Sequence, residues 1–273
     1  MKLLYSHKNF PLIGGACFML AASLSSGAVI VNSSFSGVGQ GTYDNAEQLD
    51  WFDTTTITSA TLSGAGFSAS GADKFVISVA TKRGDNAGNA VSGITYNGTN
   101  LVEVVGGTYQ RAHQSMWYFD SVTADTDLQI NYEGLNEAYA VNIFALSGTA
   151  SGFDIANTIF APATGSSPNL TSTTSGAFIF WEVGRNVSGG NLLSLDSTSG
   201  TGTYDTNKLS YGGRGKSLAA WTTDEPAGDY SITVGGLNNT ASYIGASFAA
   251  VPEPSAAILI GGLGLLTLLR RRR

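Results

Sequence analysis

Short runs of apolar and β-branched residues recur along most of the chain, with glycine, asparagine and aspartate between them. Leu128–Tyr132 alternates apolar and polar side chains, which is typical of a strand with one buried face. Asn97-Gly98 accepts the positive φ angles of a type I′ turn and predicts a hairpin. Similar runs lie at 75–79, 93–96, 101–105, 116–119, 140–146, 177–183, 217–222, 230–234 and 243–249. We therefore predict an all-β fold over residues 29–251: a two-sheet antiparallel β-sandwich with jelly-roll-like connections.

Two stretches of this body repeat one pattern at a spacing of 102 residues. Each reads as strand, polar turn, strand and then Gly-Leu-Asn. An internal duplication explains the echo, and so do two similar hairpins that meet similar packing demands. The matching residues are Ser115, Asp127, Ile130, Gly134, Leu135 and Asn136 with Ser217, Asp229, Ile232, Gly236, Leu237 and Asn238.

The first 28 residues predict a secretory signal peptide. Lys2 and Lys8 precede an apolar stretch over residues 10–24, which is short for a bilayer-spanning helix. Small side chains follow at Ser26 and Ala28, where the shallow pocket of a signal peptidase requires them. We expect signal peptidase to cut after Ala28; an uncleaved anchor is the alternative.

The C-terminus combines three features in order: Pro252-Glu253-Pro254, an uncharged stretch at 255–269, and the cluster Arg270, Arg271, Arg272 and Arg273. Two prolines keep the junction extended, so that a protease can reach its backbone. The uncharged stretch predicts a single hydrophobic helix about 22 Å long, shorter than the roughly 30 Å hydrocarbon core, and hence a temporary anchor. The arginines resist translocation and act as a membrane stop, which leaves the body outside the cytoplasmic membrane.

This tail, residues 252–273, resembles the PEP-CTERM family of sorting signals. In that family the tripeptide marks where an exosortase, a membrane-embedded protease, acts. The resemblance implies that Pro252, Glu253 and Pro254 form the processing motif, and that inner-membrane anchorage is transient, with the body first in the periplasm and then at the cell surface or outside the cell. It also implies a Gram-negative bacterium that makes extracellular polysaccharide, and a role in envelope or biofilm. An anchor without processing is the alternative.

The body also resembles a β-sandwich common in large secreted bacterial proteins. The likeness spans most of residues 55–250 and consists of the turn Thr95–Gly98, the aromatic strand Met116–Phe119 and the strands Asp127–Tyr132 and Ala140–Gly148. It implies a secreted β-sandwich body and transfers no activity to any residue.

The charge of the body excludes one large class of partner. Residues 29–251 keep eight of the 14 Lys and Arg and 19 of the 20 Asp and Glu, a formal net charge of −11. Nucleic acid is not expected as a partner, because phosphate recognition needs a basic face. Cys17, the one cysteine, leaves with the signal peptide, so disulfides and thiolate sites are not expected either.

Two residues come into question for catalysis. His113 is the one histidine outside the signal peptide, no Gly-x-Ser-x-Gly elbow occurs, and we expect a solvated loop histidine. Glu182 beside Trp181 is the best candidate for a sugar-cleaving carboxylate. Strand alternation equally allows Trp181 in the core with Glu182 in solvent, or Glu182 paired with Arg185. We expect the protein not to be an enzyme.

Calcium is the metal that the side chains favour, because carboxylate oxygens in turns suit a hard cation. The candidate ligands are Asp125, Asp127, Asp224, Glu225 and Asp229. Turns recruit aspartate for local hydrogen bonds as well, and we expect no other cofactor.

The body names no ligand by itself. Trp51, Trp117, Trp181 and Trp221 can supply flat faces for sugars or can fill the core. The leading hypothesis is a non-enzymatic surface or extracellular-matrix protein with a structural or adhesive role, and its partners are signal peptidase, an exosortase-type protease and extracellular polysaccharide. A carbohydrate-binding module is the alternative, followed by a glycan hydrolase.

Overall fold

The computed structural model describes residues 27–40, 43–44, 47–48, 52–82, 90–109, 112–120, 122, 127–136, 138–160, 165–186, 192–199, 203–211, 215–237 and 241–251. These residues belong to one compact unit and form antiparallel strands with one short helix, α1 (Ser59–Gly64). The all-β prediction is confirmed. The predicted terminal helix at 255–269 and most of the predicted signal peptide lie outside the described residues. Within the described ranges, no helix is long and apolar enough to cross a membrane.

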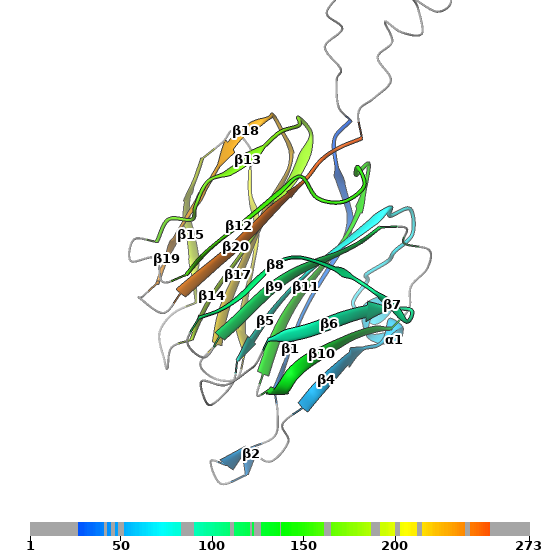
Figure 1. Cartoon of the computed structure of the whole chain (residues 1–273), viewed down its shortest axis with the longest axis vertical. Coiled ribbons are helices and arrows are strands. Elements are labelled where there is room, and N and C mark those ends of the chain that lie inside the picture. The colour runs from blue at the N-terminus through cyan, green and yellow to red at the C-terminus, as the bar shows by residue number, and fades with distance from the viewer. Residues whose placement is uncertain are drawn as a thin grey trace, which may run out of the picture. The chain divides into compact units, whose positions relative to one another are not determined.

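The first half of the body contains a five-stranded sheet and a four-stranded sheet (Figure 1). The five-stranded sheet has the order β1 (Ile30–Gln40), β11 (Ala138–Ser147), β5 (Lys74–Lys82), β9 (Ala112–Asp120), β8 (Val102–Tyr109). The four-stranded sheet has the order β4 (Phe52–Ile57), β10 (Leu128–Asn136), β6 (Val91–Tyr96), β7 (Thr99–Asn100). A short pair, β2 (Tyr43–Asp44) and β3 (Glu47–Gln48), lies between β1 and β4 in the chain.

Local sequence explains how these strands connect and which face they bury. Asn97 and Gly98 join β6 to β7 with φ angles of 50° and 71°, which is the turn that this dipeptide predicts. In β10, Leu128, Ile130 and Tyr132 are buried while the residues between them are more exposed. Their apolar side chains pack with those of β5 in one cluster, so the core of the first half lies between its two sheets.

The second half repeats this arrangement. Its five-stranded sheet has the order β12 (Ile155–Phe160), β20 (Ala241–Phe248), β14 (Ala177–Asn186), β17 (Gly215–Glu225), β16 (Asp205–Tyr211). Two short pairs face it: β13 (Leu170–Ser172) with β18 (Gly228–Tyr230), and β15 (Ser194–Thr198) with β19 (Ile232–Gly235). A second cluster, which includes Trp181, Leu218 and Ile232, fills the space between them.

The shared strand order favours an internal duplication. Strands β1, β11, β5, β9 and β8 hold the places that β12, β20, β14, β17 and β16 hold in the other half. Two unrelated hairpins do not require such agreement. The 102-residue echo matches Ser115 on β9 with Ser217 on β17, but these two residues are not structurally equivalent. Ser115 accepts a hydrogen bond from the Trp117 indole within the first core, whereas Ser217 donates to Glu182 between the halves.

The two five-stranded sheets face each other across a third apolar cluster. Val76 and Phe144 of the first half meet Phe180 and Phe248 of the second, and the rings of Phe144 and Phe180 have centroids 5.0 Å apart. Every residue of β5 is buried, because one face packs in the first core and the other against the second half. The structure therefore has three apolar layers where the sequence predicted one core between two sheets.

Candidate functional site

The two ends of the folded body lie side by side. The Gly27 amide donates to the Val251 carbonyl at 3.2 Å, and the Val251 amide donates to the Gly148 carbonyl at 2.9 Å. Figure 1 shows the start of β1 beside the chain that leaves β20. The predicted signal-peptide junction and the start of the predicted sorting tail are therefore joined at one end of the body.

The predicted processing residues are only partly described. Ala28 is half-buried. Val29, the predicted first residue of the mature chain, immediately precedes β1, is buried and donates its amide to the Gly176 carbonyl at 2.8 Å. Cleavage after Ala28 stays a prediction. Pro252, Glu253, Pro254 and the cluster Arg270, Arg271, Arg272 and Arg273 lie outside the described residues.

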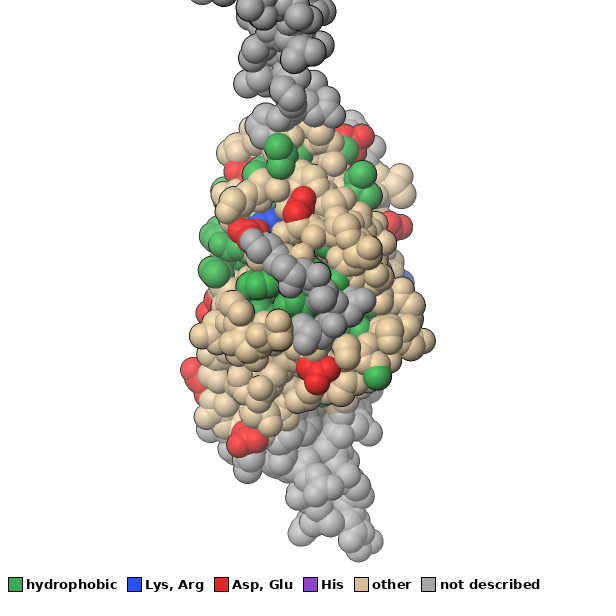
Figure 2. All heavy atoms as spheres, turned by 90° about the vertical axis from the view of Figure 1, so that its right-hand side faces the viewer, with side chains coloured by type: hydrophobic (Ala, Val, Ile, Leu, Met, Phe, Trp, Pro, Cys, Tyr) green, Lys and Arg blue, Asp and Glu red, His purple; other side chains and the backbone are tan. Residues whose placement is uncertain are grey.

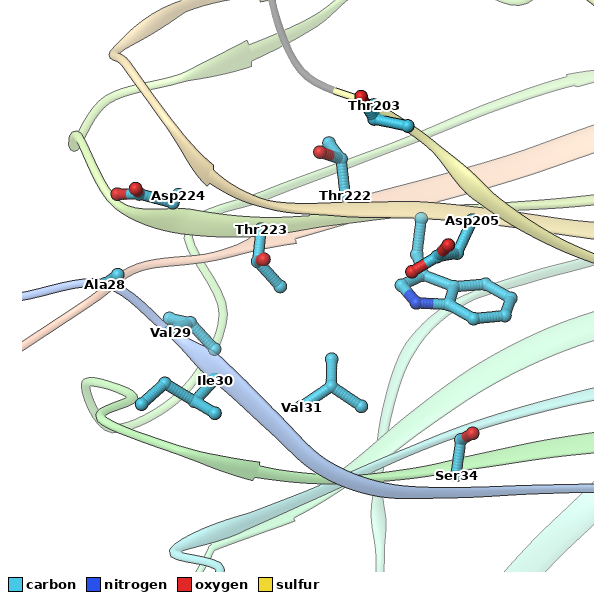
Figure 3. A pocket seen from close by; sticks show the side chains of 11 residues that line it. Ala28, Val29, Ile30, Val31, Ser34, Thr203, Asp205, Thr222, Thr223 and Asp224 are labelled. Carbon is cyan, nitrogen blue, oxygen red and sulfur yellow. The ribbon is translucent and has the colours of Figure 1, made fainter.

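A cavity of about 650 Å³ opens next to this end (Figure 3). One wall is formed by Ala28, Val29 and the first part of β1, which includes Ser34, and the other by β16 and β17. Trp221 on β17 pairs directly with Asp205 on β16, so both side chains lie on the same face of the sheet. From the sequence, Trp221 was considered only as one of four tryptophans, and Asp205 and Ser34 were not predicted as site residues. No local sequence pattern links these three residues.

The predicted calcium ligands do not converge among the residues that the structure describes. Asp127 accepts the backbone amide of Ser59 at 2.8 Å, and Asp229 accepts the Thr171 hydroxyl at 2.5 Å. Asp224 is exposed beside the cavity, while Glu225 is buried and accepts the Thr222 hydroxyl at 3.1 Å. Within the described ranges, no group of three or more His, Cys, Asp or Glu side chains is placed to hold a metal ion. Asp125 lies outside them.

Glu182 is buried between the two five-stranded sheets. It is therefore neither in solvent nor paired with Arg185, the two positions expected from strand alternation. Its carboxylate accepts hydrogen bonds from the Ser78 hydroxyl at 3.0 Å, the Asn142 amide at 3.0 Å and the Ser217 hydroxyl. Burial raises the pKa of Glu182 to about 7, and these hydrogen bonds oppose the shift. Trp181 points into the second core, as predicted by the alternative that placed its side chain in the core. Alternation places Glu182 on the other face, which a second sheet covers rather than solvent.

Two other charged or titratable side chains are also engaged in the interior. The expectation of a solvated loop for His113 is wrong: it lies buried on β9, and its Nδ1 is 2.9 Å from the Thr108 hydroxyl. Burial lowers the pKa of His113 to about 4, so that the ring is neutral near pH 7. Arg185 donates to the Gly236 carbonyl.

One face of the described body carries more acidic than basic side chains. Figure 2 shows one face of the molecule with acidic side chains scattered across it and few basic ones. Such a face repels nucleic acid and other polyanions.

Comparison with known protein families identifies a sorting motif in the C-terminal residues. The family model of the PEP-CTERM protein-sorting motif matches residues 250–273, beginning just after β20. No curated protein matches the chain. The motif implies export, transient membrane anchorage and processing by exosortase-type machinery. The chain therefore carries a PEP-CTERM protein-sorting motif at residues 250–273.

Proposed function

We propose that the chain is a non-enzymatic structural or adhesive protein of the cell surface or extracellular matrix, associated with extracellular polysaccharide. The observation that carries the proposal is the sorting motif, which follows directly on the last strand of a folded β-body. The hydrogen bond between Gly27 and Val251 adds support, since it joins the two membrane-directed ends of the precursor before cleavage after Ala28. A body held at one end presents the rest of its surface away from the membrane.

Each half of this body is, in our proposal, a jelly-roll β-sandwich. In the first half the chain passes between the two facing sheets from β4 to β5, from β5 to β6, from β9 to β10 and from β10 to β11. The equivalent strand order of the second half supports the same arrangement there. Such modules are stable without disulfides when their cores are large, which suits a mature chain without cysteine.

A non-enzymatic role agrees with the positions of the candidate catalytic side chains. Glu182 is fully buried and accepts three hydrogen bonds, so a glycan cannot reach it. His113 is buried and contacts the hydroxyl of Thr108 on the neighbouring strand β8. Glu182 therefore cannot supply one of the two carboxyl groups that a glycosidase brings to one bond of its substrate.

Replacement of Pro252, Glu253 and Pro254 by alanine tests the sorting step. The variant is expected to accumulate in the membrane fraction of the native host with its Arg cluster attached, whereas the wild-type protein reaches the cell surface or the medium. Immunoblots of separated fractions measure the ratio. Asp53→Asn, an exposed change on β4, serves as the control and should leave the distribution unchanged. Equal surface amounts of the triple variant and the wild type would contradict the proposal.

A further inference from the structure

The two halves of the body meet at two corners of equivalent construction. At one corner β8 lies near β12, and at the other β16 and β17 lie near β1. Tyr118 on β9 and Trp221 on β17 hold equivalent places, since each pairs with the central strand of its sheet, Tyr118 with Val76 and Trp221 with Phe180. Each aromatic ring also packs edge-on against a phenylalanine of the opposite half: Tyr118 against Phe248 and Trp221 against Phe144.

The chain itself fills the first corner. Phe153, from the segment just before β12, packs on Tyr118 with ring centroids 6.1 Å apart. The buried ammonium of Lys74 lies 4.7 Å from the Tyr118 ring centre and pairs with Asp120. This corner therefore has its own ring and its own cation against the tyrosine.

Among the residues that the structure describes, none fills the second corner in this way. The segment just before β1 is Gly27-Ala28-Val29, which offers no ring to place against Trp221. The cavity of about 650 Å³ lies here, a volume in the range of small-molecule sites. The Phe144 ring, 4.9 Å from the Trp221 indole between centroids, holds the indole in place.

The lining of the cavity selects the chemistry of its ligand. Thr203, Thr223 and Ser34 contribute hydroxyl groups, and Asp205 and Asp224 contribute carboxylates (Figure 3). None of the 11 described residues that line it is cationic. The carboxylates disfavour an anionic ligand, whereas an aromatic face beside several hydrogen-bond acceptors suits a ring that is apolar on its faces and bears hydroxyl groups at its edge.

We propose that this cavity binds a neutral saccharide, with one sugar ring against Trp221 and sugar hydroxyls donating to Asp205 and Asp224. The inference rests on the proposed function and names the class of polysaccharide that the body contacts. Cleavage after Ala28 would remove one lining residue and turn the Val29 amide into an ammonium. Two carboxylates and one ammonium still leave the described part of the lining with a net negative charge.

Titration calorimetry on the protein purified from its host tests the proposal. The probes are cellohexaose and mannohexaose, with a hexamer of galacturonic acid as the anionic comparison. We expect at least one neutral hexamer to bind, and the uronic-acid hexamer to bind more weakly at low salt. Trp221→Ala should lower the association constant by about tenfold or more, and Asp205→Asn by about fivefold, because each removes a direct contact.

Matched controls separate local from general effects. Asp229→Asn removes an exposed carboxylate on β18 and should leave the association constant unchanged. If Trp221→Ala does not fold, Asp205→Asn and Thr223→Val carry the test. Absence of binding to all probes, or binding that survives both Trp221→Ala and Asp205→Asn, overturns the inference. A protein that is exported and processed normally but binds no saccharide refutes this site alone and leaves the sorting function standing.

Discussion

Trp181→Ala is expected to lower the free energy of unfolding by about 3 to 5 kcal/mol. Trp181 is fully buried in the core of the second half, and its ring occupies the space beside Gly245, where a Cβ atom would collide with the indole. The indole nitrogen has no hydrogen-bond partner in the described structure, so the loss comes from packing alone. Urea unfolding followed by far-ultraviolet circular dichroism measures it.

Val38→Ala on β1 is the control for this experiment, because Val38 is 49% exposed. It should change the free energy of unfolding by less than about 0.5 kcal/mol. A loss below about 1 kcal/mol for Trp181→Ala would mean that the second core does not form as described.

Glu182→Gln is expected to remove a pH dependence of stability worth about 3 kcal/mol. The carboxyl group titrates near 4.5 when exposed, and burial raises its pKa to about 7 in the folded protein. Between these pH values the folded state binds the carboxyl proton more tightly than the unfolded state does. The stability that proton binding contributes is therefore complete below about pH 4.5 and is lost as pH rises through about 7. Each pH unit of that interval corresponds to about 1.4 kcal/mol.

The difference between variant and wild type isolates this effect. The free energy of unfolding of Glu182→Gln minus that of the wild type should increase by about 3 kcal/mol between pH 4 and pH 8, as measured by urea unfolding. His113, whose pKa burial lowers to about 4, contributes an opposite slope to both proteins and cancels in the difference. Gln129→Ala, at an exposed position of β10 that carries no titratable group, should show no such change. A parallel pH profile for Glu182→Gln and wild type would contradict the buried carboxyl.

Local sequence patterns predicted the strands but not the layers. Alternation in Leu128–Tyr132 and the Asn97-Gly98 turn are local signals, and both features are present. The run Phe75–Val79 is apolar on one face and partly on the other, and sequence alone does not say what covers the second face. The contact of β5 with the second half joins residues about 100 positions apart, which a single-core interpretation left out. For the same reason Glu182 was expected in solvent or beside Arg185.

The cavity could not be predicted from the sequence, because its lining residues come from distant parts of the chain. Trp221 meets Asp205 through the pairing of β16 with β17, and Ser34 approaches from the opposite half of the body. No spacing in the chain connects these three residues. The sorting motif, by contrast, is a continuous segment whose three parts occur in order, and the family match at 250–273 confirms the resemblance found from the residues.

The mass of the mature protein from its native host, measured separately in membranes and in surface or medium fractions, tests the central claim most directly. The account predicts a chain that begins at Val29 and ends near Pro252 to Pro254, recovered from the surface or the medium. A chain that still carries Arg270 to Arg273 and occurs only in membranes would contradict it, since the tail would then be a plain anchor.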